Sequence, residues 1–201
     1  MKVEAVLFDV GNVLIQWDPR HLYRKLLPSE PEVERFLAEV CTLDWHLAHD
    51  AGVSFEENAA LLKARHPHHA ALIDDWGRRY LEMSPGAVEG MEALVQGLED
   101  AGVPLHGLTN MPSSVFPMLK EAFPVMNRLK TVVVSGDEKV CKPDPRIYEL
   151  ALSSMGTEPS RSLFIDDSVR NVEAAAALGF EVHHFRDARG LEADLARLGL
   201  L

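Results

Sequence analysis

The sequence predicts an α/β fold, a doubly wound parallel sheet with an inserted all-helical domain, and two observations carry this prediction. From about residue 83 to the end, apolar β-branched runs alternate with helical patterns, which is typical of βαβ units. Residues 16–82 break that rhythm, because they offer helical patterns and no convincing strand. We therefore expect a Rossmann-like core of residues 1–15 and 83–201, and a helical cap of residues 16–82.

Short apolar runs predict the strands of the core, and helical periodicity between Gly, Pro and polar turns predicts its helices. The strands are expected at residues 3–8, 104–108, 131–134 and 162–165, with a last one around His183 and His184. The core helices are expected at 87–101, 113–122, 145–155, 169–178 and 191–198. In the cap, helical patterns cover 21–27, 31–40, 55–64 and 69–82.

Polar side chains follow the predicted strands, at the point where each strand ends. Asp9 closes the first run, Thr109 and Asn110 follow the second, Lys142 follows the third after a short loop, and Asp166 and Asp167 end the fourth. Ligands of open α/β sheets bind in the crevice at the carboxyl ends of the strands. An aspartate, a hydroxyl, a lysine and a carboxylate pair can converge there on one phosphate and one divalent cation.

In order and spacing these segments resemble the haloacid dehalogenase superfamily. The segments are FDVGNVL from Phe8, LTN from Leu108, Lys142, and FIDDSVRN from Phe164, with Leu178 and Gly179 after the last. The resemblance covers most of the chain, and the set of four motifs is far more specific than any single one. The Asp-x-Gly-Asn-Val type of nucleophile loop is similar to that of a subgroup of sugar-1-phosphate phosphatases.

The resemblance implies a magnesium-dependent phosphomonoester hydrolase that acts on a small phosphorylated metabolite, such as a sugar phosphate. Asp9 would attack phosphorus and form an aspartyl-phosphate that water then hydrolyses. Because two anions repel, a divalent cation must lie between Asp9 and the phosphate. The expected Mg²⁺ ligands are Asp9, the Gly11 carbonyl, Asp166 and Asp167, with Asp167 binding directly. Thr109, Asn110 and Lys142 would bind the phosphate, Lys142 would also act in catalysis, and Asn171 would orient the metal site.

One position departs from the family pattern. Most phosphatases of the superfamily carry a second aspartate two residues after the nucleophile, as general acid and base, and this chain has Gly11. A general acid contributes roughly 10²- to 10⁴-fold, so the proton must come from elsewhere or the leaving group must depart unaided, as an anomeric hydroxyl does more readily. Asp18, His46 and His49 are candidate substitutes for the acid.

Two alternatives stay open at this point. A 2-haloacid dehalogenase also lacks an acid at the second position, but adjacent carboxylates at Asp166 and Asp167 would repel the carboxylate of its substrate. A non-catalytic phosphate-binding or regulatory module would keep the fold without turnover. Each residue singled out also has an ordinary structural role, such as a turn aspartate at Asp9 or a helix cap at Asp167.

Composition narrows the partners. The formal net charge is −11 and no run of Lys or Arg occurs, which argues against nucleic acid and against an anionic membrane surface. Only Cys41 and Cys141 are present, and Glu4 and Asp9 interrupt the N-terminal apolar stretch that a secretory peptide would need. We expect a cytoplasmic protein with a small-molecule phosphorylated substrate, and the sequence does not determine the oligomeric state.

Overall fold

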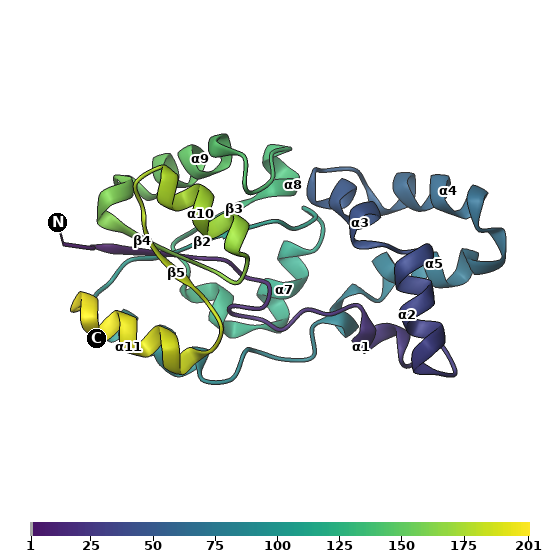
Figure 1. Ribbon diagram of the computed structural model, residues 1–201, viewed down its shortest axis with the longest axis horizontal. Helices are drawn as coiled ribbons and strands as arrows, with labels where there is room; N and C mark the ends of the chain where they lie inside the picture. The colour runs from purple at the N-terminus through teal and green to yellow at the C-terminus, as the bar shows by residue number, and fades with distance from the viewer. Residues whose placement is uncertain (1) are drawn as a thin grey trace.

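The computed structural model describes residues 2–201 and carries a five-stranded sheet with helices on both faces (Figure 1). The strands are β1 (Ala5–Phe8), β2 (Leu105–Thr109), β3 (Thr131–Val134), β4 (Ser162–Asp166) and β5 (Glu181–His184). Their order is β3-β2-β1-β4-β5 and all four pairings are parallel. The predicted doubly wound parallel sheet is therefore confirmed, with β1 at its centre.

The central strand is apolar throughout because both of its faces are covered. Val6 and Phe8 pack into one hydrophobic cluster, whereas Leu7 packs into a second cluster on the opposite face. Successive side chains of a strand point to opposite faces. A parallel strand covered on both sides therefore has a continuous apolar run instead of an alternating pattern.

Helices from the C-terminal part of the chain cover the two faces. They are α6 (Met91–Asp100), α7 (Phe116–Ala122), α8 (Ser135–Glu138), α9 (Pro145–Met155), α10 (Val169–Ala177) and α11 (Ala188–Leu198), with 3₁₀ turns η3 (Pro124–Arg128) and η4 (Pro159–Arg161). In Figure 1, α9 and α10 lie on one side of the sheet, and α7 and α11 lie on the other. The helix predicted over 113–122 begins later, at Phe116, because residues 113–115 form a turn.

The chain between β1 and α6 is helical, as predicted for the inserted cap. It contains α1 (Arg20–Tyr23), α2 (Glu30–Glu39), α3 (Leu43–Asp50), α4 (Phe55–Arg65), η1 (Pro67–His69), α5 (Ala70–Arg78) and η2 (Tyr80–Met83), which we call the helical segment. The prediction of one helix over 69–82 is wrong, because α5 ends at Arg78 after Gly77, a weak helix former. The boundaries at 15/16 and 82/83 stay a prediction, and Met1 lies outside the described residues.

The chain enters and leaves the helical segment along two connections that pair with each other. Ile15 forms a parallel bridge with Gly11 and an antiparallel bridge with Ala87. Gln16 N donates to Gly86 O at 2.9 Å. β1 runs toward the helical segment in Figure 1, so that segment lies beyond the carboxyl ends of the strands.

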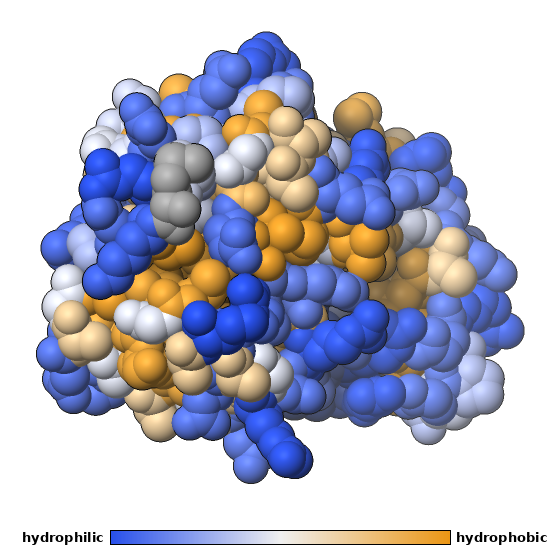
Figure 2. All heavy atoms as spheres, turned by 60° about the vertical axis from the view of Figure 1, so that its left-hand side comes forward, coloured by the Kyte–Doolittle hydropathy of each residue, from blue (hydrophilic) through white to orange (hydrophobic). Residues whose placement is uncertain are grey.

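The surface is largely hydrophilic on the face drawn in Figure 2, with apolar atoms exposed in a broken band across the sheet-bearing part. Among residues 2–201, no helix combines the length and the apolar character that are needed to cross a membrane. The cytoplasmic location stays a prediction of the sequence.

Candidate active site

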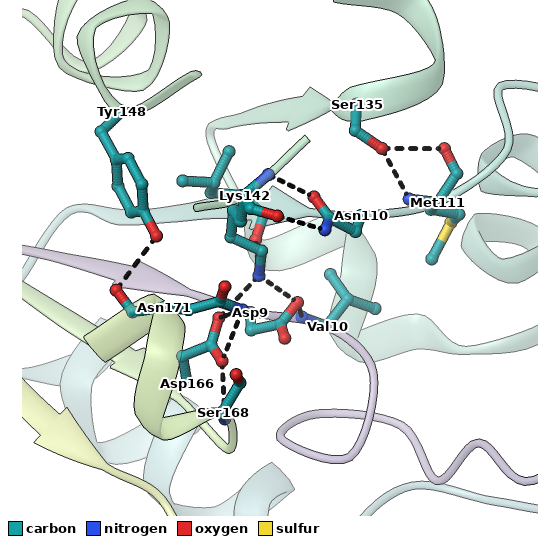
Figure 3. Close-up of polar contacts among 11 residues, drawn as sticks. Asp9, Val10, Asn110, Met111, Ser135, Lys142, Tyr148, Asp166, Ser168 and Asn171 are labelled. Carbon is teal, nitrogen blue, oxygen red and sulfur yellow. Dashed lines mark hydrogen bonds and ion pairs between the residues drawn. The ribbon is translucent and has the colours of Figure 1, made fainter. Parts of the chain in front are cut away.

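Polar side chains from neighbouring strand ends meet at the carboxyl edge of the sheet (Figure 3). Asp9 follows β1 directly, Thr109 ends β2, and Asp166 ends β4. β1 pairs with both β2 and β4, so these three ends are neighbours. Lys142 reaches the same place from the loop that follows α8 (Figure 3). Side chains that are up to 157 positions apart in the sequence thus come together.

The Lys142 ammonium lies between two carboxylates. Its Nζ is 2.9 Å from Asp9 Oδ1 and 2.7 Å from Asp166 Oδ2, and it donates to Leu108 O at 3.0 Å. The side chain is only 1% exposed. Burial opposes the charge, but Asp9 and Asp166 outweigh it and raise the pKa of Lys142. The lysine is therefore a fixed positive charge at this edge of the sheet.

Asn110 fixes the backbone that carries Lys142. Its side-chain amide donates to Lys142 O at 3.0 Å, and its Oδ1 accepts from Lys142 N at 2.8 Å. The Asn110 side chain is thus engaged with the loop, and its backbone N–H stays the group proposed for phosphate. Thr109 is buried beside it at the end of β2.

The two oxygens of Asp9 differ in their surroundings. Oδ1 accepts from Val10 N at 2.7 Å and faces Lys142, whereas Oδ2 has no hydrogen bond from residues 2–201. Burial raises the pKa of the Asp9 carboxyl, Lys142 lowers it, and the Asp166 carboxylate raises it further, so that the net shift is upward. One oxygen is therefore held in place by two partners, while the other has no hydrogen bond from the described residues.

Asp166 and Asp167 are adjacent in sequence but have different environments. Asp166 is fully buried, and its oxygens accept from Ser168 N at 2.8 Å, from Asn171 Nδ2 at 3.1 Å and from Lys142. Asp167 is exposed, while its backbone carbonyl accepts from His184 Nε2 at 3.0 Å. Partial burial and the Asp166 charge raise the pKa of Asp167. Asp166 holds Lys142 and Asn171, and Asp167 keeps its carboxylate available.

We call Asp9, Lys142, Asp166 and Asp167 the charged cluster. One oxygen from each of the three aspartates can be chosen so that all lie within 4.8 Å of one another. Three carboxylates face a single ammonium, so negative charge is in excess. Hard oxygen ligands at this spacing fit a divalent cation such as Mg²⁺, whose charge would balance the excess. Asp9 and Asp167 have the less occupied oxygens for such an ion.

A small cavity of about 100 Å³ lies beside the charged cluster, and we call it the side cavity. Its walls come from the core and from the helical segment: Val10, Gly11, Ile15, Trp17, His46, Asp50, Tyr80, Ser84, Thr109, Asn110, Met111 and Leu119. A Cβ built on Gly11 would meet no heavy atom within 4 Å, so the glycine leaves open space where the family pattern has an acid. A larger hollow of about 490 Å³, between Trp45 and Arg78, has no residue of the charged cluster in its lining.

The three candidate substitutes for the acid are not equivalent. His46 lines the side cavity, but burial and His49 lower its pKa to about 3, and its Nδ1 accepts from Trp76 Nε1 at 3.2 Å. It is therefore a neutral ring, with its proton on Nε2. His49 donates to Val53 O, and Asp18 accepts from Arg20 N, and neither lines the side cavity.

Sequence reasoning missed two polar residues of the side cavity, Asp50 and Ser84, each 5% exposed. Burial raises the pKa of Asp50 to about 7, although Lys142 acts in the opposite direction. Asp50 ends α3, a helix that the sequence did not predict. The sequence indicated Asp50 only weakly, because Asp50 directly follows His49, one of the candidate acids.

Comparison with known proteins finds similarity to hydrolases, among them phosphatases. A profile described as haloacid dehalogenase-like hydrolase matches residues 3–179. The N-acetylmuramic acid 6-phosphate phosphatase of Pseudomonas aeruginosa is 35% identical over 194 residues, which cover 89% of this chain and 80% of that protein. The sesquiterpene phosphatase astK of Aspergillus oryzae is 31% identical over 108 residues, 54% of this chain, and the match spans about half of its own length (55%).

Among solved structures, a haloacid dehalogenase family enzyme of Bacteroides thetaiotaomicron, in complex with magnesium and inorganic phosphate, superposes with a TM-score of 0.71. The sequences are 20% identical, and the match covers 92% of this chain and 95% of the other. At this identity the similarity demonstrates a shared fold.

Proposed function

Because the chain belongs to the haloacid dehalogenase-like hydrolases, we propose that it hydrolyses the phosphomonoester of a small phosphorylated metabolite with the help of Mg²⁺. The observation that carries the proposal is the charged cluster, in which the Lys142 ammonium bridges Asp9 and Asp166 while Asp167 stays exposed. A buried lysine among three carboxylates has a high desolvation penalty. It is typical of a site that balances the charges of an anionic substrate and a cation.

In the proposed reaction, Asp9 Oδ2 attacks phosphorus. The new bond joins the carboxylate oxygen to phosphorus, and the bond from phosphorus to the leaving oxygen breaks. Water then attacks the phosphorus of the aspartyl-phosphate, which releases inorganic phosphate and restores Asp9. The hydrogen bond from Val10 N to Oδ1 holds the carboxylate and leaves Oδ2 for the attack.

The remaining residues of the site are proposed to bind the phosphoryl group and the cation. Lys142 and the backbone N–H of Asn110 are the proposed donors to phosphoryl oxygens, with the Thr109 hydroxyl beside them. Mg²⁺, held by Asp9, the Gly11 carbonyl and Asp167, with Asp166 alongside, would supply positive charge between nucleophile and phosphate. Asn171 restricts the Asp166 carboxylate through its amide.

A sugar phosphate is the substrate class that the relatives support best. N-acetylmuramic acid 6-phosphate phosphatase is named for a sugar phosphate and matches most of this chain. Gly11 provides no acid for the leaving oxygen, so we expect the chain to favour leaving groups that depart easily or that receive a proton from another residue.

The charged cluster also distinguishes this proposal from 2-haloacid dehalogenation. Halide leaves without a proton and without a metal, so a dehalogenase has no need of an exposed carboxylate at Asp167 next to Asp166. In addition, the excess negative charge of the cluster would repel a haloacid carboxylate. A phosphate would meet the same repulsion, but a divalent cation relieves it.

The test measures phosphate release from acetyl phosphate, glucose 1-phosphate and glucose 6-phosphate, with Mg²⁺ and with chelator. Acetyl phosphate is included because acetate leaves without an acid. Asp9→Asn is compared with Asp100→Asn, an exposed aspartate at the end of α6. We expect Mg²⁺-dependent release that only Asp9→Asn abolishes.

Two other results would redirect the proposal. Release of chloride from 2-chloropropionate, without phosphate release from any of the three phosphorylated compounds, would identify a dehalogenase. Release of neither product, with or without metal, would contradict both enzymatic readings and favour a phosphate-binding module.

A further inference from the structure

Among the three aspartates of the charged cluster, Asp167 has the least restrained carboxylate. The carboxylates of Asp9 and Asp166 each contact Lys142 and accept a hydrogen bond from a backbone N–H. The Asp167 side chain is exposed, so its position depends on the backbone that carries it. Mg²⁺ demands near-ideal octahedral geometry, with oxygens at about 2.0–2.1 Å. Whatever restrains the Asp167 backbone therefore affects how well a cation is bound.

Hydrogen bonds fix the chain on both sides of Asp167. Phe185 N donates to Asp166 O at 2.9 Å, and Ser168 N donates to Asp166 Oδ1 at 2.8 Å. Between these two contacts, the Asp167 carbonyl accepts from His184 Nε2 at 3.0 Å. Within residues 2–201 no backbone N–H donates to this carbonyl, so the His184 ring is its one donor there. Loss of the ring would release one peptide group of the turn between β4 and α10.

The sheet places this ring beside the turn. β5 pairs in parallel with β4, and the Cα atoms of His184 and Asp166 are partners in that pairing. Successive side chains of a strand point to opposite faces. His183 accordingly contacts Asp194 of α11 at 2.6 Å, whereas His184 reaches the turn before α10. The two adjacent histidines thus have separate contacts, and His183 is a matched control for His184.

The contact requires an N–H group and does not require a charge. A carbonyl oxygen only accepts, so His184 Nε2 carries the hydrogen, which a neutral imidazole and an imidazolium both provide. Glutamine also has a side-chain N–H donor but no charge, and leucine has neither. Substitution by glutamine and by leucine therefore separates the hydrogen bond from the charge of the ring.

The ring would act through the backbone of Asp167. The ligand atoms that lie within 4.8 Å of one another belong to Asp9, Asp166 and Asp167, and within residues 2–201 no histidine nitrogen joins this group. Partners that hydrogen-bond to metal-binding residues orient them, and their loss costs roughly 10- to 100-fold in metal affinity. Because the carbonyl and the carboxylate belong to the same residue, the hydrogen bond from His184 restrains Asp167 directly.

We propose that His184 is a positioning residue for the cation site. Its ring holds the Asp167 carbonyl, and this keeps the Asp167 carboxylate near those of Asp9 and Asp166. His184 is not itself a ligand in this arrangement. The inference rests on the proposed function, because that function gives the three aspartates a cation to bind. It adds a residue of β5, which lies outside the four sequence motifs.

The test measures binding of Mn²⁺, as a probe of the cation site, to the protein without substrate, from the EPR signal of the free ion. His184→Leu should raise the Kd for Mn²⁺ by about 10- to 100-fold. His184→Gln retains an N–H donor and should stay within about 3-fold of the wild type. His183→Leu removes the neighbouring ring, which contacts Asp194, and should leave the Kd unchanged.

The dependence of activity on Mg²⁺ gives a second readout. In His184→Leu, the Mg²⁺ concentration for half-maximal phosphate release from acetyl phosphate should rise by the same factor as the Kd. The kcat at saturating Mg²⁺ should approach that of the wild type. A purely structural role would instead lower kcat at every Mg²⁺ concentration. Urea denaturation with chelator shows that each variant is folded before its affinity is compared.

Three results would overturn the inference. They are an unchanged Kd for Mn²⁺ in His184→Leu, a loss in folded His184→Gln as large as that in His184→Leu, and an equal loss in His183→Leu. The second result would assign the effect to the charge or the shape of the ring, and the third to a general disturbance of β5. A wild type that binds no Mn²⁺ would instead contradict the cation of the proposed function, so the two failures are distinguishable.

Discussion

In the charged cluster, both oxygens of Asp166 accept hydrogen bonds, whereas in the adjacent side cavity Asp50 Oδ1 and Ser84 Oγ have no partner among residues 2–201. Asp166, Asp50 and Ser84 are all buried, so solvent does not account for the difference. Paired groups are fixed before a ligand arrives, which suits stabilisation of charge in a transition state. Unpaired groups gain most when a ligand supplies the missing partner.

The two regions also come from different parts of the fold. Asp9 and Asp166 stand at adjacent strand ends, while Asp50 belongs to α3 of the helical segment. Ser135 joins the helical segment to the core, because its hydroxyl donates to Asp50 O at 2.6 Å and accepts from Met111 N at 2.9 Å. Chemistry and recognition can therefore vary separately on this fold.

Replacing the lysine at the centre of the charged cluster should have the largest effect. Lys142→Met leaves Asp9 and Asp166 facing each other without a cation, which we expect to lower stability by about 3–5 kcal/mol. Phosphate release should fall by about 10³-fold, because a fixed positive charge at the phosphoryl oxygens is lost. Urea denaturation and a phosphate assay measure the two effects.

Lys63→Met is the matched control. Lys63 contacts Asp74 at 2.6 Å, but its side chain is 33% exposed, so the expected change in stability is under about 1 kcal/mol. Similar losses in the two variants would contradict the special role of the charged cluster.

The next prediction concerns pH. The pKa of Asp50 in the folded protein is raised to about 7 from 3.8, so the stability it contributes is full below about pH 4 and is lost as pH rises through 7. Asp50→Asn removes this loss. Relative to the wild type, its free energy of unfolding should therefore increase by up to about 4 kcal/mol between pH 4 and pH 8.

The contribution of His46 to stability has the opposite dependence on pH. Because burial lowers the pKa of His46, that contribution decreases as the pH falls below about 6.5. It is present in both proteins, so its own contribution is common to the two stability curves apart from its contact with Asp50 at 3.4 Å. Denaturation at pH 4, 6 and 8 measures the difference, and parallel stability curves for wild type and variant would refute the burial of an ionisable Asp50.

Filling the open space at Gly11 sharpens the comparison between the two regions. Gly11→Asp introduces a carboxyl at the position where the family pattern has an acid, and a Cβ there meets nothing within 4 Å. We expect hydrolysis of propyl phosphate, whose leaving group is poor, to rise by about 10²-fold relative to Gly11→Ala. The alanine variant adds the same Cβ without a proton donor, and equal rates for the two variants would argue against a missing acid.

The smallest predicted effect is at Ser135, the junction between the helical segment and the core. Ser135→Ala leaves Met111 N–H and the Asp50 carbonyl without a buried partner, which should cost about 1–3 kcal/mol in urea denaturation. Ser29→Ala, at an exposed hydroxyl that contacts Glu32, should change stability by less than about 0.5 kcal/mol. An equally small change at Ser135 would mean that the junction is already hydrated.

The fold was largely predictable because buried parallel strands and amphipathic helices have distinct sequence patterns. The helix α3 was not predictable, because its apolar side chains are exposed and its polar side chains are buried. Leu43 and Leu47 are 60% and 52% exposed, whereas His46, His49 and Asp50 are buried. A rule that assigns apolar residues to the interior misreads such a helix.

The two regions of the site also differ in how far the sequence could predict them. Asp9, Lys142 and Asp166 could be expected together, because the carboxyl ends of parallel strands share one edge of the sheet. Asp50 and Ser84 could not, because they reach the side cavity only through the way in which the helical segment packs on the core. The roles of the charged cluster stay proposals.

The central claim is that the charged cluster forms a covalent aspartyl-phosphate on Asp9. The most direct test incubates the protein with ³²P-labelled acetyl phosphate and Mg²⁺, quenches in acid within the first turnover, and maps the label by mass spectrometry. We predict hydroxylamine-labile label on the peptide that contains Asp9, and none in Asp9→Asn or with chelator. Phosphate release that persists in Asp9→Asn, with no labelled peptide in the wild type, would contradict the account.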